Sequence, residues 1–213
     1  MNCCQCQGIE QVFNAKVAAR ELRSYRKKGP GKTTRLLIDA LKSRGVEGLT
    51  LLDIGGGVGK IQHELLDSGA GRAVSVDASS GYIQASQGEA ERRGHGDRTQ
   101  FIHGNFVELA PGIGEADIVT LDRVVCCYPD MNALVGLSAE RARRYYGLVY
   151  PRDTVFARAG IAVLNLMVRF VWRTPFRGFV HRTESVDAEV LRHGLRKVFF
   201  RKTIVWQVVL YAR

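Results

Sequence analysis

The chain has 213 residues, of which 46% are hydrophobic and 24% charged, as expected for a globular protein with one substantial core. Its longest apolar stretch, residues 161–172, is about half of the ~20 residues that a membrane span needs, and it contains Asn165 and Arg169. We therefore expect a buried or interfacial helix there and no transmembrane segment. The first residues lack the basic start and the apolar stretch of an export signal, which predicts a cytoplasmic protein.

The formal net charge of +10 is unevenly distributed along the chain. Residues 1–140 hold 16 Lys and Arg against 17 Asp and Glu, whereas residues 141–213 hold 15 against 4. A basic face beside a pocket attracts an anionic small molecule, a nucleic acid or an acidic membrane surface, and charge alone does not separate these partners. A solvated face without a partner is the alternative.

Five cysteines occur, three of them near the N-terminus (Cys3, Cys4 and Cys6) and two as the adjacent pair Cys126 and Cys127. An odd number of cysteines in a reducing compartment favours free thiols. The N-terminal three do not match the usual zinc spacing, in which one C-x2-C pair is followed by a second pair. We therefore predict no metal site, while binding of a soft metal or arsenite by these thiolates stays open as an alternative.

The first part of the chain predicts two helices. Apolar residues recur at roughly helical spacing over residues 9–28, and this pattern ends at Lys-Lys-Gly-Pro-Gly. Thr33 and Thr34 can cap a second helix, for which Gly45 is a natural stop. We interpret residues 1–45 as an N-terminal helical lid or substrate-side segment and residues 46–213 as the core.

From residue 49 the pattern changes to an alternation of strands and helices. Short apolar or β-rich runs predict seven strands, at residues 49–54, 73–77, 99–103, 118–121, 145–150, 195–201 and 204–211. Helical patterns follow the first two strands, at residues 61–66 and 82–93. The alternation predicts an α/β fold whose mainly parallel sheet carries helices on both faces, and the last two strands predict an antiparallel β-hairpin. Ligands of such sheets bind at the carboxyl ends of the strands.

The strongest local signal is the run at residues 51–59, Leu-Leu-Asp-Ile-Gly-Gly-Gly-Val-Gly, between a strand and a helix. It resembles the first motif of class I S-adenosylmethionine-dependent methyltransferases, which have a Rossmann-like fold. In that family the glycine loop lets the backbone pass closely under the cofactor, because a side chain there would occupy the cofactor's space, and the acidic residue holds the methionine end. The resemblance therefore implies S-adenosylmethionine as cofactor and, as its binding residues, Asp53, Gly55, Gly56, Gly57 and Gly59.

A dinucleotide-binding fold is the competing interpretation of this loop. Its fingerprint has the glycine arrangement G-x-G-x-x-G, and counting from Gly55 the third position is Lys60, because the glycine falls one residue early. Asp77 closes the second strand, where a carboxylate accepts hydrogen bonds from ribose hydroxyls in either class of protein, and Ala78 follows it. The C-terminal hairpin favours the methyltransferase, whose fold ends in an antiparallel strand inserted into the sheet.

Further cofactor residues are implied by the resemblance after the third and fourth strands. Asn105 and Phe106 stand where many methyltransferases place an acidic or amide residue against the adenine amino group, and the amide oxygen of Asn105 can accept that bond. Asp122 and Arg123 stand where the family's loop approaches the methionine end and the substrate. A surface ion pair is the alternative for these two residues.

Residues 122–129, Asp-Arg-Val-Val-Cys-Cys-Tyr-Pro, resemble the corresponding loop of magnesium-protoporphyrin IX O-methyltransferases, in which a histidine stands in the place of Cys127. The resemblance implies that Tyr25, on the upstream helix, closes over the cofactor and orients the acceptor; packing on the sheet is the alternative. His181 could remove a proton from an acceptor hydroxyl, or serve as a capping or packing residue. The candidate catalytic residues are Tyr25, His181 and Cys127.

The resemblance implies a methyltransferase acting on a small molecule that is anionic or partly apolar, with transfer to oxygen or carbon. Residues 161–172 and 176–179 would form a lid or pocket wall. Nucleic-acid methylation through the basic C-terminal third is an alternative, although the Asn/Asp-Pro-Pro-Tyr type of loop that holds a flipped adenine is absent. A non-catalytic cofactor-binding protein is another. The sequence indicates no particular oligomeric state.

Overall fold

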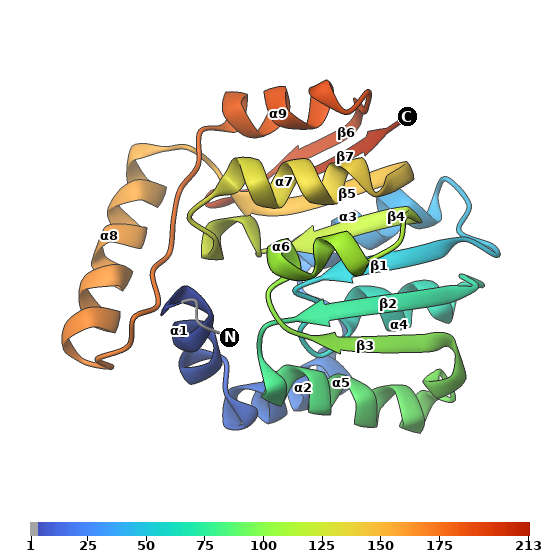
Figure 1. The fold of residues 1–213 in the computed structure, drawn as a ribbon, viewed down its shortest axis with the longest axis horizontal. Helices are drawn as coiled ribbons and strands as arrows, with labels where there is room; N and C mark the ends of the chain where they lie inside the picture. Colours follow the sequence, from blue (N-terminus) through green and yellow to red (C-terminus); the bar gives the residue numbers. More distant parts are fainter. Residues whose placement is uncertain (1–3) are drawn as a thin grey trace.

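Seven strands form one twisted sheet in the order β3-β2-β1-β4-β5-β7-β6 in the computed structural model, which describes residues 4–213 (Figure 1). The strands are β1 (Thr50–Ile54), β2 (Arg72–Asp77), β3 (Thr99–His103), β4 (Ala116–Asp122), β5 (Ala142–Pro151), β6 (Arg196–Lys202) and β7 (Trp206–Ala212). β1 to β5 are parallel neighbours, whereas β7 is antiparallel to both β5 and β6. The predicted fold class, with its C-terminal hairpin, is confirmed.

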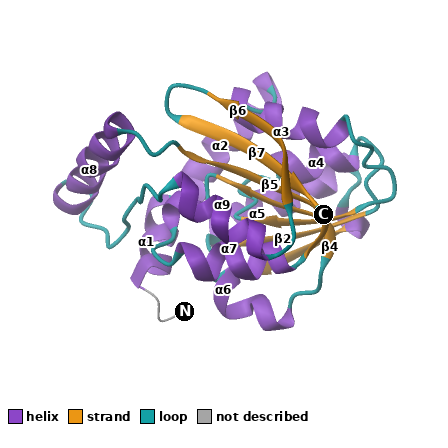
Figure 2. Ribbon diagram, turned by 90° about the horizontal axis from the view of Figure 1, so that it is seen from above, coloured by secondary structure: helices purple, strands orange, loops and turns teal. Residues whose placement is uncertain are grey.

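Helices cover both faces of this sheet (Figure 2). They are α1 (Cys4–Val12), α2 (Ala15–Lys28), α3 (Lys32–Lys42), α4 (Lys60–Leu66), α5 (Ser80–Arg93), α6 (Phe106–Leu109), α7 (Met131–Glu140), α8 (Val155–Phe170) and α9 (Thr183–Arg192), with 3-10 turns η1 (Gly96–Arg98), η2 (Ala110–Gly112) and η3 (Val125–Cys127). One apolar cluster joins the sheet to α6, α7 and α9, a second joins it to α3 and α4, and a small third cluster joins α2 to α5.

Strand alternation explains how two cores arise from one sheet. Leu51 and Ile118 belong to the cluster on the α3 and α4 side, whereas their neighbours Leu52 and Val119 belong to the cluster on the α7 side. Successive side chains of a strand point to opposite faces, and both faces here are covered. These strands therefore read as continuous apolar runs in the sequence.

The N-terminal part differs from the sequence prediction in two ways. Asn14 breaks the expected helix 9–28 into α1 and α2, because its side-chain oxygen caps α2 by accepting from the backbone of Lys16 and Val17. The second difference concerns α3, which lies before the predicted boundary at residue 45. Leu37 and Leu41 of this helix are fully buried against β1, β5 and β7, so α3 belongs to the core.

Helix α8 stands away from the sheet, beyond α1 (Figures 1 and 2). Of its residues only Ala157 and Val168 are buried, so of the two expected alternatives, a buried or an interfacial helix, the structure excludes the buried one. Over residues 4–213, no helix combines the length and apolar composition needed to cross a membrane. Cys3 lies outside the described residues, as do the side chains of Cys4 and Cys6, and the described part holds no His, Cys, Asp and Glu grouping suited to a metal.

Candidate active site

A cavity of about 220 Å³ opens at the carboxyl ends of β1, β2 and β4. These ends point toward the side of the molecule that carries α1 (Figure 1). The cavity is lined from the sheet side by Asp53, Ile54, Gly55, Gly56, Gly57, Lys60, Ile61, Val76, Asp77, Ala78, Tyr82, Gly104, Asn105, Phe106, Asp122, Arg123, Val124, Cys127, Tyr128 and Leu134, and from the N-terminal helices by Ile9, Phe13 and Glu21. The structure thus brings together residues that are far apart in the sequence.

The loop after β1 can be built only with glycine at its central positions. Gly55 and Gly57 have positive φ angles of 64° and 58°, a region that side chains rarely adopt. A Cβ atom on Gly56 would lie 2.7 Å from the Oγ of Ser75 and 3.0 Å from Oδ2 of Asp53. The bare backbone of this loop therefore forms one wall of the cavity.

Gly59 does not line the cavity, although it belongs to the same sequence motif. It precedes α4 with a φ of 79°, and a Cβ atom there would lie within 2.7 Å of the side chains of Gln62, His63 and Ser86. Its role in the structure is the close packing of α4 against α5. The motif therefore combines a cavity wall with a helix-packing position.

Asp77 holds the glycine loop in place. Its Oδ2 accepts from the backbone N–H of Gly57 at 2.9 Å, and its Oδ1 accepts from the N–H of Ser79 at 2.8 Å. Burial raises the pKa of Asp77 to about 6, although these two hydrogen bonds favour the carboxylate. The carboxylate thus lies at the wall of the cavity between the loops that follow β1 and β2.

Asp53 is a buried carboxyl group with one unpartnered oxygen. Thr120 donates to its Oδ1 at 2.7 Å, while its Oδ2 has no hydrogen-bond partner among the described residues. Burial raises the pKa of Asp53 to about 7, and the charges of Asp122 and Asp77 add to this effect. A buried polar atom without a partner is costly, so Oδ2 is suited to a donor or a cation in the cavity.

Asp122 and Arg123 follow β4 and line the same cavity. Oδ2 of Asp122 accepts from the hydroxyl of Thr34 at 2.6 Å, whereas its Oδ1 lies 3.6 Å from Nε of Arg123, beyond hydrogen-bond distance. Both of these atoms lack a hydrogen-bond partner among the described residues. Arg123 also has a φ of 63°, which is unusual for a residue other than glycine. The predicted pair is therefore at the cavity and is not a solvated surface ion pair.

Asn105 and Phe106 form the wall that follows β3. The side-chain oxygen of Asn105 caps α6 by accepting from the N–H of Val107 at 3.2 Å, and its Nδ2 donates to Glu108 at 2.9 Å. An amide oxygen has two lone pairs, so one acceptor site remains beside the cap. Phe106 is buried and presents an apolar surface.

The N-terminal wall was not predicted from the sequence. Glu21 of α2 forms an ion pair of 2.5 Å with Lys60 and accepts from the hydroxyl of Tyr82, so it joins α2 to α4 and α5 at the cavity. Burial alone would raise the pKa of Glu21, but Lys60 and Tyr82 more than offset it, and the pKa is lowered. In the sequence, Glu21, Lys60 and Tyr82 look like residues on the solvent-exposed side of a helix. Their residue types alone give no sign that they meet at a cavity.

Helix α1 is fastened across the cavity at both ends. Glu10 accepts from both the N–H and the hydroxyl of Ser80, next to β2. The side chain of Gln5 donates to the carbonyls of Cys127 and Arg177, each at 2.7 Å, and accepts from the N–H of Arg177. Helix α1 thereby connects the loops after β2 and β4 with the segment that follows α8.

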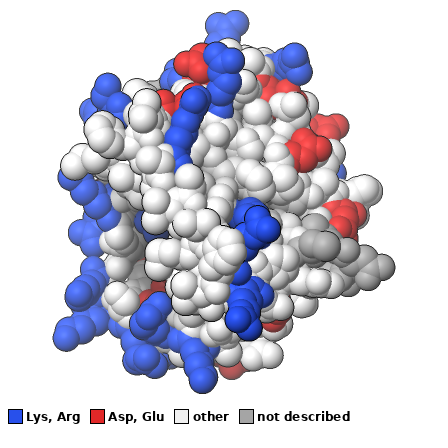
Figure 3. Space-filling view, turned by 90° about the vertical axis from the view of Figure 1, so that its left-hand side faces the viewer, with Lys and Arg blue, Asp and Glu red and all other residues white. Residues whose placement is uncertain are grey.

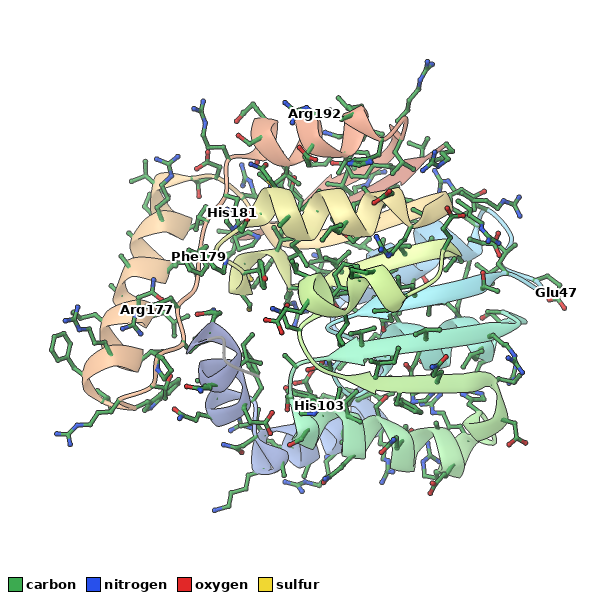
Figure 4. All side chains as sticks on the ribbon, in the orientation of Figure 1. Glu47, His103, Arg177, Phe179, His181 and Arg192 are labelled. Carbon is green, nitrogen blue, oxygen red and sulfur yellow. The ribbon has the colours of Figure 1, made fainter. Side chains whose placement is uncertain are left out.

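The three candidate catalytic residues have different positions. Tyr25 is buried, donates to Glu64 at 3.1 Å and does not line the cavity, so the structure shows it packed between α2, α4 and α5. His181 also lies outside the lining and contacts the carbonyl of Tyr128 at 2.9 Å (Figure 4). Cys127 lines the cavity. The thiol of Cys126 and burial raise its pKa, so Cys127 stays protonated.

The segment 161–179 does not form a wall of the cavity, because no described residue of that range lines it. The side chain of Asn165 in α8 both accepts from the N–H of Gly178 and donates to its carbonyl. The inner side of α8 is therefore used to hold the segment after it. Phe176 reaches only the outer side of the wall, where its ring contacts Phe13 edge to face at 5.6 Å.

Sequence comparison places a known family over the centre of this chain. Residues 51–143 match the family described as "Methyltransferase domain". Similar curated proteins are ribosomal protein L11 methyltransferases, one from Enterobacter sp. (strain 638), 32% identical over 120 residues, and one from Pelotomaculum thermopropionicum, 29% identical over 138 residues. These matches span 52% and 65% of this chain but only 40% and 43% of the relatives' length.

Comparison with solved structures extends the likeness over nearly the whole fold. Magnesium protoporphyrin IX methyltransferase from Synechocystis PCC 6803, with bound SAH, has a TM-score of 0.71 and 19% identity, covering 96% of this chain and 98% of that one. An O-methyltransferase family protein from Burkholderia thailandensis has a TM-score of 0.70 and 17% identity, covering 95% and 61%. Residues 51–143 thus match a methyltransferase domain, and the fold of nearly the whole chain is the one that these methyltransferase structures share.

Proposed function

We propose that the cavity binds S-adenosylmethionine and that the protein transfers its methyl group to a small, partly apolar molecule. The observation that carries this proposal is the wall of bare backbone at Gly55 to Gly57, which faces buried carboxylates on two sides. A nucleoside with a cationic amino-acid end fits such a cavity. The glycine wall lets the ligand come close to the backbone, and Oδ2 of Asp53, which has no hydrogen-bond partner among the described residues, can accept a hydrogen bond from it.

The lining residues suggest how the cofactor would be held. Asp77 would accept from the ribose hydroxyls with its remaining lone pairs, because each carboxylate oxygen can accept more than one hydrogen bond. Asp53 and Asp122 would hold the cationic methionine end. Asn105 and Phe106 would contact the adenine, the first through its free acceptor site and the second through its ring. These assignments follow the order of the strands, whose carboxyl ends carry all five residues.

The cofactor supplies an electrophilic methyl group on a sulfonium, so the protein's main task is to align an acceptor with it. Neither Cys127 nor His181 is suited to act as a base at the cavity, and Asp53, Asp77 and Asp122 are assigned to the cofactor. Cys127 keeps its proton, and burial lowers the pKa of His181, which lies outside the lining and is already engaged with the carbonyl of Tyr128. We therefore infer catalysis by proximity and exclusion of water, with the acceptor's own acidity deciding between oxygen and carbon.

The acceptor side of the cavity is apolar. Ile9, Phe13, Val124 and Leu134 contribute to its lining, together with Tyr128. Such a wall suits a ring or an aliphatic group better than a phosphate chain. The likeness to ribosomal protein L11 methyltransferases covers 52% of this chain and 40% of the length of the Enterobacter protein, so it does not assign an acceptor to this chain.

The basic residues of the C-terminal third lie at both ends of the sheet, so their distribution does not by itself select a nucleic acid. Arg143 and Arg144 lie near the start of β5, and Arg196 lies near the same end of the sheet, as the pairing of both strands with Ala212 and its neighbours shows. The cavity is at the opposite, carboxyl end of β4 and its parallel neighbours. These three arginines are therefore distant from the proposed site of chemistry, whereas the five arginines of residues 154–183 belong to the segment that is bonded to α1.

Calorimetric titration with S-adenosylhomocysteine tests the cofactor half of the proposal. We expect saturable binding that Asp77→Asn weakens about tenfold or more, the size of a lost charge-assisted hydrogen bond. Asp97→Asn, at an exposed aspartate of η1, is the matched control and should bind as the wild type does. A folded wild-type protein that binds no S-adenosylhomocysteine would contradict the proposal.

Incubation with three acceptor pools tests the other half. With S-adenosylmethionine present, we expect S-adenosylhomocysteine to form with a small-molecule extract and not with ribosomal protein or with RNA. Turnover with ribosomal protein or RNA would show that the acceptor is a macromolecule and not a small molecule. The assignment of S-adenosylmethionine as the cofactor would still hold. Cofactor binding without turnover in any pool would favour a non-catalytic binding protein.

A further inference from the structure

The outward face of α8 is an exposed apolar surface. Phe156 is 89% exposed, Phe170 is 64% exposed and Trp172, just beyond the helix, is 52% exposed. Val155, Val163, Leu166, Met167 and Val171 are exposed as well. Together these eight residues form what we call the α8 surface. Contiguous apolar surface of this kind on a folded protein marks a place of interaction.

The orientation of α8 is fixed by its other face. Asn165 makes two hydrogen bonds to Gly178, Val168 is fully buried, and Ile161 lies against the backbone of Gly178. These contacts already satisfy the inner side of the helix. The outward side chains therefore do not belong to the core of this chain. Only another molecule or a membrane could cover them.

The charged residues of the segment that holds α8 and the residues after it are all arginines. Residues 154–183 contain five arginines and neither Asp nor Glu. Arg158 pairs with Asp153, which precedes the helix, while Arg169, Arg173, Arg177 and Arg182 make no ion pair with a described residue. Figure 3 looks onto this side of the molecule and shows Lys and Arg side chains around a broad uncharged area.

The position of α8 relates it to the cavity. It lies on the side of the molecule to which β2, β3 and β4 point, beyond α1 (Figure 1). The segment after α8 is tied to α1 by the hydrogen bonds between Gln5 and Arg177, and Phe176 packs on Phe13. A partner on the α8 surface would therefore sit next to the helix that covers the cavity.

We propose that the α8 surface inserts into an anionic lipid membrane surface, with α8 lying in the plane of the interface. Its 16 residues are too few for a span, but an exposed apolar face with flanking arginines and a terminal tryptophan is the composition of interfacial helices. A second copy of this chain fits less well, since it would bring the same arginines and no carboxylate from residues 154–183. This inference does not depend on the proposed cofactor.

Vesicle sedimentation tests the inference with the full chain. Wild-type protein should sediment with vesicles of phosphatidylcholine and phosphatidylglycerol in equal parts, and much less with vesicles of phosphatidylcholine alone. The double variant F156S/F170S should lower the partition coefficient at least about tenfold, because each ring loses its burial in the acyl boundary. R158E/R169E should lower it about 25-fold or more, since each arginine near an anionic surface is worth about fivefold.

Two control variants test whether vesicle binding depends on the α8 surface or on any exposed apolar or basic residue. I204S/V205S removes two exposed apolar residues from the loop between β6 and β7, and R196E reverses an exposed arginine on the edge strand. Both should sediment as the wild type does, and all variants should keep the wild-type melting temperature. The inference would be overturned if every variant sedimented with the vesicles as much as the wild type does. It would also be overturned if the wild-type protein did not sediment with them. A wild-type dimer that F156S/F170S makes monomeric without any vesicle binding would overturn it as well.

Discussion

Asp53 should destabilise the folded protein at neutral pH, and replacing it by asparagine should stabilise the fold while weakening cofactor binding. Burial raises the pKa of Asp53 from 3.8 to about 7. In the unfolded chain the group loses its proton near pH 4, whereas in the folded protein it keeps the proton until about pH 7. Stability therefore falls as the pH rises from 4 to 7 and stays at the lower level above it.

The size of this effect follows from the shift. Each pKa unit corresponds to 1.36 kcal/mol, so a shift of about three units costs the folded state about 4 kcal/mol above pH 7. Asparagine cannot ionise and keeps the acceptor for the Thr120 hydroxyl, which donates to Oδ1 at 2.7 Å. We expect the gain in unfolding free energy from Asp53→Asn to be about 2–3 kcal/mol larger at pH 8 than at pH 5.

Guanidinium unfolding at the two pH values measures this difference. Asp117→Asn is the matched control of opposite sign. The carboxylate of Asp117 accepts from the N–H and the hydroxyl of Thr50, and its pKa is lowered, so its stabilisation is present above pH 4 and lost in acid. Asp117→Asn should therefore destabilise equally at pH 8 and pH 5, and less only below about pH 4. A pH-independent effect of Asp53→Asn would refute the reasoning from burial.

Three further variants test the walls of the cavity. Gly56→Ala should lose S-adenosylhomocysteine binding by calorimetry and about 1–3 kcal/mol of stability, because its Cβ meets the Oγ of Ser75 at 2.7 Å; unchanged binding would remove this loop from the site. Tyr25→Phe should cost about 1 kcal/mol of unfolding free energy and leave turnover unchanged, and a fall in kcat would return Tyr25 to the catalytic candidates. Lys60→Met should lower the melting temperature more at pH 8 than at pH 5, since it removes the cation beside Glu21; equal losses at both pH values would contradict that pairing.

The sequence predicts the sheet and most of its ligand edge because that information is local. A buried run that contains Asp53 and is followed by three glycines determines where β1 stops, and the parallel arrangement then brings the loops after β1, β2 and β4 to one edge. Asp53, Asp77 and Asp122 therefore line the cavity as their positions after strands predicted. Gly59 of the same motif lies outside the lining, and its neighbours Gln62 and Ser86 give it a packing role that the motif does not reveal.

The N-terminal wall depends on contacts between distant residues, and local patterns do not contain them. Glu21 and Tyr25 are one helical turn apart on α2, and either could have been the residue at the cavity. The break at Asn14 and the packing of α2 on α5 bring Glu21 to Lys60 and Tyr82, which leaves Tyr25 a turn further away, beside Glu64. The selection is made by tertiary packing.

Two parts of the molecule carry separable properties. The carboxyl edge of the sheet presents carboxylates and bare backbone, which suit a cofactor, whereas α1 and the segment after α8 decide what else reaches it. Gln5 bonds to Arg177 as well as to Cys127, so a displacement of the α8 region would pull on the helix that covers the cavity. Binding of α8 to a surface would thus act on access to the acceptor side, while the glycine loop, fixed by Asp77, would keep its shape.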